Sequence, residues 1–351
     1  SGHVRIYDYN GSAWVQVGGD IDGEGEGDGS GFSVSLSSDG SRVAIGAYSN
    51  DGTNGANSGH VRIYDYDGSA WVQVGGDIDG EAENDQSGRA VSLSSDGTRV
   101  AIGAKDNDGA NGSNSGHVRI YDYNGSAWVQ VGADIDGEAV NDNSGSSVSL
   151  SSDGSRVAIG APENGGNGSS SGHVRIYDYD GSAWVQVGAD IDGEAQGDAL
   201  GYSVSLLSDG SRVAIGAPLN DAGNASSYSW GHVRIYDYNG SAWAQVGADI
   251  DGEGAGDQSG NAISISSDGS RVAIGAPSNN GAASDAGHVR VYSLPGEVYK
   301  YTWDVDNGST PPSGTYYATV AGTASATGGT YSGTDSITFT LDTSAPTVTL
   351  T

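Results

Sequence analysis

The chain has 351 residues, of which 60 are glycine and none is cysteine or methionine, and 45 Asp and Glu residues against 14 Lys and Arg residues give a formal net charge of −31. The absence of cysteine excludes a disulfide scaffold and thiol catalysis. The acidic surface repels nucleic acid phosphates and anionic membranes, and no run of about 18 apolar residues occurs, so we expect neither a nucleic acid partner nor membrane insertion.

One phrase, SGHVRIYDYNGSAWVQVG, opens the chain and returns five more times in variant form. Its copies begin about 57 residues apart, a period that is typical of repeat architectures. A residue that occurs in every copy is therefore first a requirement of the repeat and only second a candidate for chemistry. The histidines that mark the copies are His3, His60, His117, His173, His232 and His288.

Each full copy predicts four short antiparallel strands. In one copy these are residues 32–37, 42–47, 60–66 and 70–74, and Asp-Gly pairs between the strands indicate tight hairpins. Four strands per repeat form the blade of a β-propeller. A β-solenoid has shorter coils, and a row of small sandwiches needs more strands per unit. The sequence predicts an all-β fold, with a β-propeller of about six four-stranded blades over residues 1–296.

A tryptophan and a histidine recur in the blades. A tryptophan stands in the fourth strand and is expected to wedge between blades, with carbohydrate stacking as the alternative. The histidines are expected to be structural, with the ring tip hydrogen-bonded to a neighbouring loop, because propeller symmetry holds them apart and zinc needs four ligands on one ion. The tryptophans are Trp14, Trp71, Trp128, Trp184 and Trp243.

An acidic linker of the form DIDGE follows the fourth strand, and its carboxylates fall at relative positions 1, 3, 5 and 9. Such oxygen-rich, glycine-containing loops suit calcium, which takes six to eight oxygen ligands. The alternative is a linker whose Asp side chains cap turns. The candidate calcium ligands are Asp20, Asp22, Glu24, Asp28, Asp77, Asp79, Glu81, Asp85, Asp134, Asp136, Glu138, Asp142, Asp190, Asp192, Glu194, Asp198, Asp249, Asp251, Glu253 and Asp257.

The stretch GFSVSLSSDGSRVAIGA, followed by GHVRIYDY, resembles the FG-GAP repeat of integrin-α-like propellers. Gly-Ala-Pro occurs outright at 160–162, 216–218 and 275–277. The family's calcium hairpin does not carry over, because here that hairpin is too short and too poor in carboxylates. Similar repeats with the DIDGE phrase are typical of large surface or secreted proteins of marine bacteria, so the resemblance implies an extracellular or cell-surface location.

The loop between the second and third strands varies most between copies. It is longest in the fourth full copy, where it spans residues 218–230 and carries Tyr228 and Trp230. Variable loops on a rigid scaffold often carry binding residues, so these two aromatics are candidates for ligand contact. The alternative is an aromatic cluster that stabilises the loop.

The repeat ends near residue 296, and residues 297–351 resemble a partial bacterial Ig-like module, with strands expected at 315–322, 335–341 and 346–350. The first hairpin, at residues 4–17, lacks the two strands that precede it in other copies. Such strands are expected from sequence upstream of this piece, from the C-terminal strands, or from a second copy through homo-assembly by strand exchange.

No catalytic constellation emerges, so the sequence predicts a protein that is not an enzyme. We expect an extracellular adhesion or structural module, with the propeller as a platform for protein or glycan on a surface and the Ig-like segment as its stalk. The alternative is a secreted, calcium-dependent lectin-like protein that binds polysaccharide through its exposed aromatics.

Overall fold

The computed structural model describes residues 1–221, 229–281 and 283–295, together with five strands of the C-terminal segment. The chain divides into two compact units, Ser1–Leu294 and Pro295–Thr351. The described residues form strands, turns and loops without a helix, which confirms the all-β class. Within those residues, nothing helical has the length and apolar character needed to cross a membrane.

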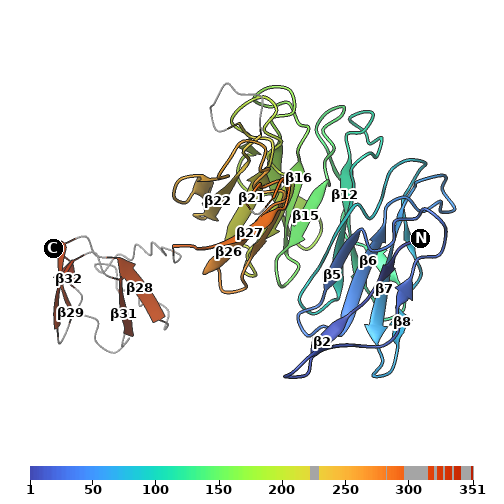
Figure 1. Cartoon of the computed structure of the whole chain (residues 1–351), viewed down its shortest axis with the longest axis horizontal. Coiled ribbons are helices and arrows are strands. Elements are labelled where there is room, and N and C mark those ends of the chain that lie inside the picture. The colour runs from blue at the N-terminus through green and yellow to red at the C-terminus, as the bar shows by residue number, and fades with distance from the viewer. Residues whose placement is uncertain are drawn as a thin grey trace. The chain divides into compact units, whose positions relative to one another are not determined.

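The first unit contains five antiparallel blade sheets that follow one another along the chain, besides two small strand pairs at its N-terminus (Figure 1). Each of these blade sheets contains three strands that are called its first, second and third strand, in chain order. The first strands are β5 (Ser33–Leu36), β10 (Ala90–Leu93), β15 (Ser147–Leu150), β20 (Ser203–Leu206) and β25 (Ala262–Ile265). The second strands are β6 (Arg42–Ala47), β11 (Arg99–Ala104), β16 (Arg156–Ala161), β21 (Arg212–Ala217) and β26 (Arg271–Ala276). The third strands are β7 (His60–Tyr66), β12 (His117–Tyr123), β17 (His173–Tyr179), β22 (His232–Tyr238) and β27 (His288–Ser293).

Four of the sheets add a fourth strand and a two-residue strand that pairs with the start of the third. The fourth strands are β8 (Trp71–Gln73), β13 (Trp128–Gln130), β18 (Trp184–Gln186) and β23 (Trp243–Gln245). The two-residue strands, which belong to the acidic linkers, are β9 (Ile78–Asp79), β14 (Ile135–Asp136), β19 (Ile191–Asp192) and β24 (Ile250–Asp251).

The blade count differs from the expected number of about six: the structure has five blades. The N-terminal copy forms only two small pairs, β1 (His3–Val4) with β4 (Ile21–Asp22) and β2 (Tyr7–Tyr9) with β3 (Trp14–Gln16). It has no first or second strand, so it is a half-blade. Counting third-strand hairpins in the sequence therefore overestimates the blades by one.

Hydrophobic clusters between successive blades form the core. In one of them Val118 and Ile120 of the second blade pack with Val148, Leu150 and Ile159 of the third. The inner strands lie side by side in the order β5, β10, β15, β20 and β25, and no comparable contact among the described residues joins β25 to β5. Burial of this apolar surface between sheets explains how a chain with few hydrophobic residues forms a stable core.

The tryptophan of the fourth strand lies between blades, as predicted. Trp71 Nε1 donates to the carbonyl oxygen of Val17 in the preceding copy at 2.8 Å. Beyond the half-blade, the same bond recurs from Trp128 to Val74, from Trp184 to Val131 and from Trp243 to Val187. The indole thus satisfies its only donor while its ring fills the space between two sheets.

The turn between first and second strands is closed by an aspartate. Asp39 Oδ1 accepts hydrogen bonds from Ser41 N at 2.9 Å and from the Ser37 hydroxyl at 2.7 Å. The bond from the Ser41 backbone, then those from the Ser37 and Ser41 hydroxyls, lower the pKa of Asp39 to about 2. In the last blade, Ser266 and Ser270 lower the pKa of Asp268 to about 2.

These turns predict an acid-sensitive contribution to stability. Because the folded-state pKa lies below the unfolded value of 3.8, the contribution is present above about pH 4 and is lost as the pH falls toward 2. We expect the double variant Asp39→Asn, Asp268→Asn to show a smaller drop in Tm between pH 4 and pH 2 than the wild type, measured by circular dichroism. Equal drops in the two proteins would contradict this assignment.

The second unit contains two small sheets. One pairs β28 (Thr315–Thr319) with β31 (Ser336–Thr340), and the other has the order β30, β29, β32, formed by Gly329–Gly333, Gly322–Ala326 and Thr349–Leu350. Strands occur within the three predicted regions, and β29 and β30 add a hairpin that was not predicted. The pairing does not confirm an Ig-like module.

Candidate metal centre

The acidic linkers meet the histidines because of the two-residue strands. In the first blade, β9 pairs with the start of β7, so that His60 lies opposite Asp79 and Val61 opposite Ile78. The same register recurs in the next three blades. Since Ile78 is buried and anchors the linker, the carboxylates on both sides of it are held near the histidine of the third strand.

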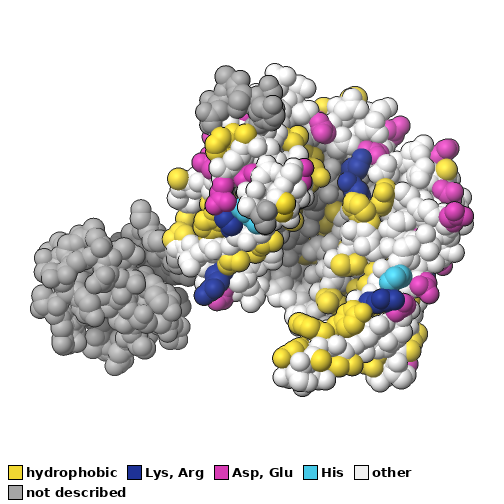
Figure 2. Space-filling view, in the orientation of Figure 1, with side chains coloured by type: hydrophobic (Ala, Val, Ile, Leu, Met, Phe, Trp, Pro, Cys, Tyr) yellow, Lys and Arg dark blue, Asp and Glu magenta, His cyan; other side chains and the backbone are white. Residues whose placement is uncertain are grey.

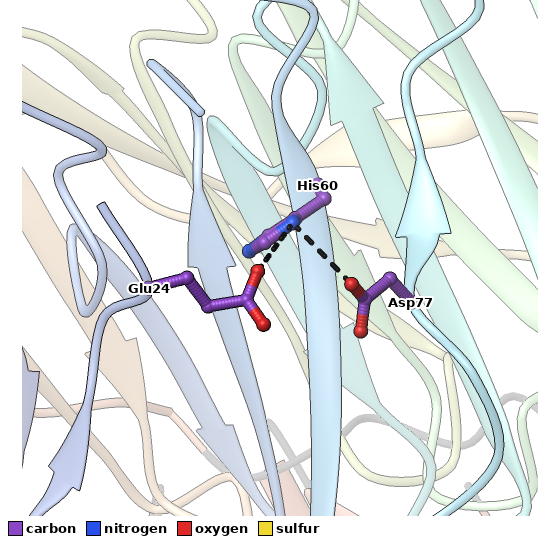
Figure 3. A group of neighbouring side chains, drawn as sticks. All are labelled: Glu24, His60 and Asp77. Carbon is purple, nitrogen blue, oxygen red and sulfur yellow. Dashed lines mark ion pairs between the residues drawn. The ribbon is translucent and has the colours of Figure 1, made fainter. Parts of the chain in front are cut away.

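Each of four histidines faces two carboxylates from different linkers. His60 Nδ1 is 4.0 Å from Glu24 Oε2 and 4.0 Å from Asp77 Oδ2 (Figure 3). Glu24 lies in the linker of the N-terminal half-blade, and Asp77 lies in the linker of the first blade. The triads are Glu24–His60–Asp77, Glu81–His117–Asp134, Glu138–His173–Asp190 and Glu194–His232–Asp249.

The histidines are buried and the carboxylates are partly exposed. The His60 side chain is 2% exposed, and no hydrogen bond to its ring is found among the described residues. Burial, followed by the neighbouring arginine, lowers the pKa of His117 and of His173 to about 4. The imidazoles are therefore neutral at pH 7, and a neutral imidazole is the form that binds a metal.

The carboxylates concentrate negative charge at each triad. Partial burial raises the pKa of Glu81, and Asp134, Asp85 and Asp136 raise it further, while Arg119 opposes them. Glu138 has the corresponding surroundings in the next blade. A cation placed between the carboxylates would relieve this repulsion, so the triads could hold a metal ion.

A surface hollow of about 520 Å³ lies at the first triad. Its lining residues are glycines and polar residues, most of which carry side-chain oxygens, so it suits water and cations better than apolar ligands. The lining residues include Glu24, Glu26, Asp28, Asp51, His60, Asp77 and Asp79.

The predicted calcium ligands of one linker lie in different places in the structure and contact residues of different blades. In the linker of the first blade, Asp77 faces His60, whereas Glu81 faces His117 of the next blade. Asp85 is buried, and its Oδ2 accepts from Ala82 N at 2.8 Å and from Asn107 Nδ2 at 3.1 Å. The four side chains therefore do not converge on one point, because the linker crosses from one blade to the next. Calcium binding by the linkers stays a prediction.

The other linkers follow this division with small differences. The carboxylate at position 1 accepts from a glutamine in every copy, and in the N-terminal copy Asp20 also pairs with Arg5 at 2.9 Å. The aspartates at position 3 lie in the two-residue strands, and those at position 9 accept from a backbone N–H of their own linker. The position 3 residues are Asp22, Asp79, Asp136, Asp192 and Asp251, and the position 9 residues are Asp28, Asp85, Asp142, Asp198 and Asp257.

The sequence-based expectation assigned the histidines a structural hydrogen bond and did not name them as candidate metal ligands. The sequence does contain a pattern that could have identified them. Each buried histidine lies at a nearly constant number of residues after a glutamate and before an aspartate. In the last blade, His288 Nδ1 is 3.7 Å from Glu253 Oε2.

Of the aromatic candidates, Tyr228 lies outside the described residues. Trp230 is half-buried, and its Nε1 is buried with no hydrogen-bond partner among the described residues. Its carbonyl oxygen accepts from Ser259 N at 3.0 Å, which ties the end of the loop to the following linker. Ligand contact by Tyr228 and Trp230 stays a prediction.

The fold and these clusters together define the class: a five-bladed, acidic β-propeller repeat protein with metal-binding potential between its blades. No family model matches the chain, and no curated protein matches it. The FG-GAP resemblance is therefore not confirmed.

Among solved structures, the chain is similar to hydrazine synthase of Kuenenia stuttgartiensis, with 17% identity and a TM-score of 0.48. The match covers 77% of this chain and 65% of the other, so this chain matches less than two thirds of that protein. The expectation that the protein is not an enzyme is withdrawn: the matched structure is an enzyme, and the likeness supports no statement about the activity of this chain in either direction. A likeness at this level does not make the present chain an enzyme.

Proposed function

We propose that the chain is an extracellular or cell-surface module with an adhesive or structural role, in which propellers join end to end. The repeated, acidic blades supply a platform for surface-bound protein or glycan, and the C-terminal strands supply an Ig-like stalk. The single observation that supports this role most strongly is the apolar surface left exposed on the first and last blades.

Residues that are buried in the inner blades are open at the ends. In the last blade Val289 is 68% exposed, whereas its counterpart Val233 is 0% exposed. In the first blade Val34 is 53% exposed, whereas its counterpart Val91 is 9% exposed. Figure 2 shows hydrophobic side chains on the surface at both ends of this unit. Exposed apolar faces of this kind mark interaction sites.

The two exposed faces are complementary to each other. Inside the chain, the third-strand face of one blade packs on the first- and second-strand face of the next, as Val118 and Ile120 pack on Val148 and Leu150. The last blade presents the former face, through Val289 and Val291. The first blade presents only the first-strand part of the latter, through Val34 and Leu36, because Val4 and Ile6 of the half-blade already cover Val43 and Ile45. The occupant that fits is a second copy, in a head-to-tail contact that can continue into filaments.

We expect the full chain to show a molar mass that rises with concentration in light scattering, and filaments in negative-stain images. Placing a charge on the last blade with Val289→Lys should abolish this association, because a buried unpaired charge opposes face packing. The control is Val72→Lys, which alters a half-exposed valine on a fourth strand. A chain that stays monomeric at all concentrations would exclude end-to-end assembly.

A further inference from the structure

We propose that each Glu–His–Asp triad binds one divalent first-row transition-metal ion, of the zinc class and not calcium, and thereby links two successive blades. The inference rests on the triad geometry and not on end-to-end association, which is measured separately by scattering.

The buried histidine is aimed at both carboxylates without a partner of its own. His117 is 2% exposed, and its Nδ1 lies 3.8 Å from Glu81 Oε2 and 3.9 Å from Asp134 Oδ2. These separations are too long for hydrogen bonds. For His60 and His173 the other ring nitrogen, Nε2, is also buried without a hydrogen-bond partner. A buried polar ring that makes no hydrogen bond among the described residues requires an explanation; an ion between the three groups would give Nδ1 a partner, while Nε2 would stay without one.

Each carboxylate is held through the oxygen that does not face the histidine. Gln130 Nε2 donates to Asp134 Oδ1 at 2.6 Å, and Arg119 Nη1 lies 3.4 Å from Glu81 Oε1. The remaining oxygens, Oδ2 and Oε2, point at Nδ1. Outer partners that orient ligands in this way are a regular feature of metal sites.

The nature of the ligands selects the class of ion. Calcium takes oxygen ligands almost exclusively, whereas imidazole nitrogen suits zinc, copper, iron and nickel. The three ligand atoms of each triad lie within 4.8 Å of one another. Small movements of the exposed Glu81 side chain and of Asp134 would bring them to zinc distances of about 2 Å, with water completing the coordination.

The site joins two blades. Glu81 comes from the linker that leaves the first blade, whereas His117 and Asp134 belong to the second. An ion bound only in the folded state stabilises that state. Metal binding at each triad would therefore stabilise the contact between the two neighbouring blades that supply its ligands.

The test is loading of the full chain with Zn²⁺ or Co²⁺, followed by desalting and elemental analysis. We expect four ions per wild-type chain, one for each triad, a rise in Tm, and a Co²⁺ absorption spectrum distinct from that of the hydrated ion. Excess Ca²⁺ should not displace the cobalt.

The matched variants are Glu81→Gln and Glu83→Gln, two exposed glutamates of one linker, of which only Glu81 belongs to a triad. Both remove one negative charge from the same loop. Glu81→Gln should lower the content from four ions to three, and Glu83→Gln should leave it at four. Equal contents in the two variants, an unchanged cobalt spectrum, or displacement by calcium would each overturn the proposal.

Discussion

Gly160→Ala is expected to lower the free energy of unfolding by about 3 kcal/mol, although it adds a single methyl group to a β-strand. Gly160 lies in β16, where the backbone of the next blade approaches so closely that an added Cβ would overlap the carbonyl oxygen of Gly201. Because the obstacle is backbone, no side-chain rotation relieves the overlap. The two blades would have to separate.

The last blade supplies the control. Gly275 holds the equivalent position in β26, but no further blade follows it among the described residues, and the atom nearest to an added Cβ would be the Ala262 carbonyl oxygen at 3.5 Å. Gly275→Ala is therefore expected to change stability by less than about 1 kcal/mol. The measurement is chemical denaturation of both variants beside the wild type. Similar losses in the two variants would show that strand conformation, and not the distance between blades, is the cause.

Trp128→Ala is expected to cost about 3 kcal/mol, because a large side chain is removed from between two blades. The ring packs against the cluster that contains Ile63 and Tyr121, and its Nε1 donates to Val74 O at 2.9 Å. Truncation leaves both a cavity and an unpaired carbonyl oxygen.

The matched control is Trp14→Ala in the N-terminal half-blade. Trp14 is 69% exposed, and the ring contact found for it in the described structure is a tilted one with Tyr9, with ring centroids 5.5 Å apart. Its loss should reduce Tm by a fraction of the shift that Trp128→Ala causes. Thermal melts followed by near-ultraviolet circular dichroism compare the two, and an equal shift would rule out the wedge role of Trp128.

Much of the local structure follows from short-range pattern. Alternating residues around Asp39-Gly40 and Asp67-Gly68 specify hairpins, because alternation sets which side chains share a face and glycine accepts the positive φ of the turn. The predicted strands of the blade therefore agree with β5 to β8 to within one residue at every end. The wedge role of tryptophan was also predictable, since the residue recurs in the same strand of every full copy.

Spacing along one segment was a poor guide to the candidate site. The four carboxylates of a linker are close in sequence, and this favoured a single calcium loop. In the folded chain Asp77 and Glu81 belong to different triads, because the buried Ile78 anchors the linker to one blade while its end reaches the next.

The sequence by itself determined the repeat, the four-strand blade, the all-β class and the strong negative charge, because hairpins and alternation depend on neighbours a few residues apart. Only the tertiary structure decided that the blades number five, that apolar residues such as Val34 and Val289 of the first unit's outer blades are exposed, and that each of four buried histidines meets carboxylates from two linkers. These features depend on which blades lie next to each other. Residues of neighbouring blades are separated by about one repeat in the chain, a distance at which local pattern carries no information about contact.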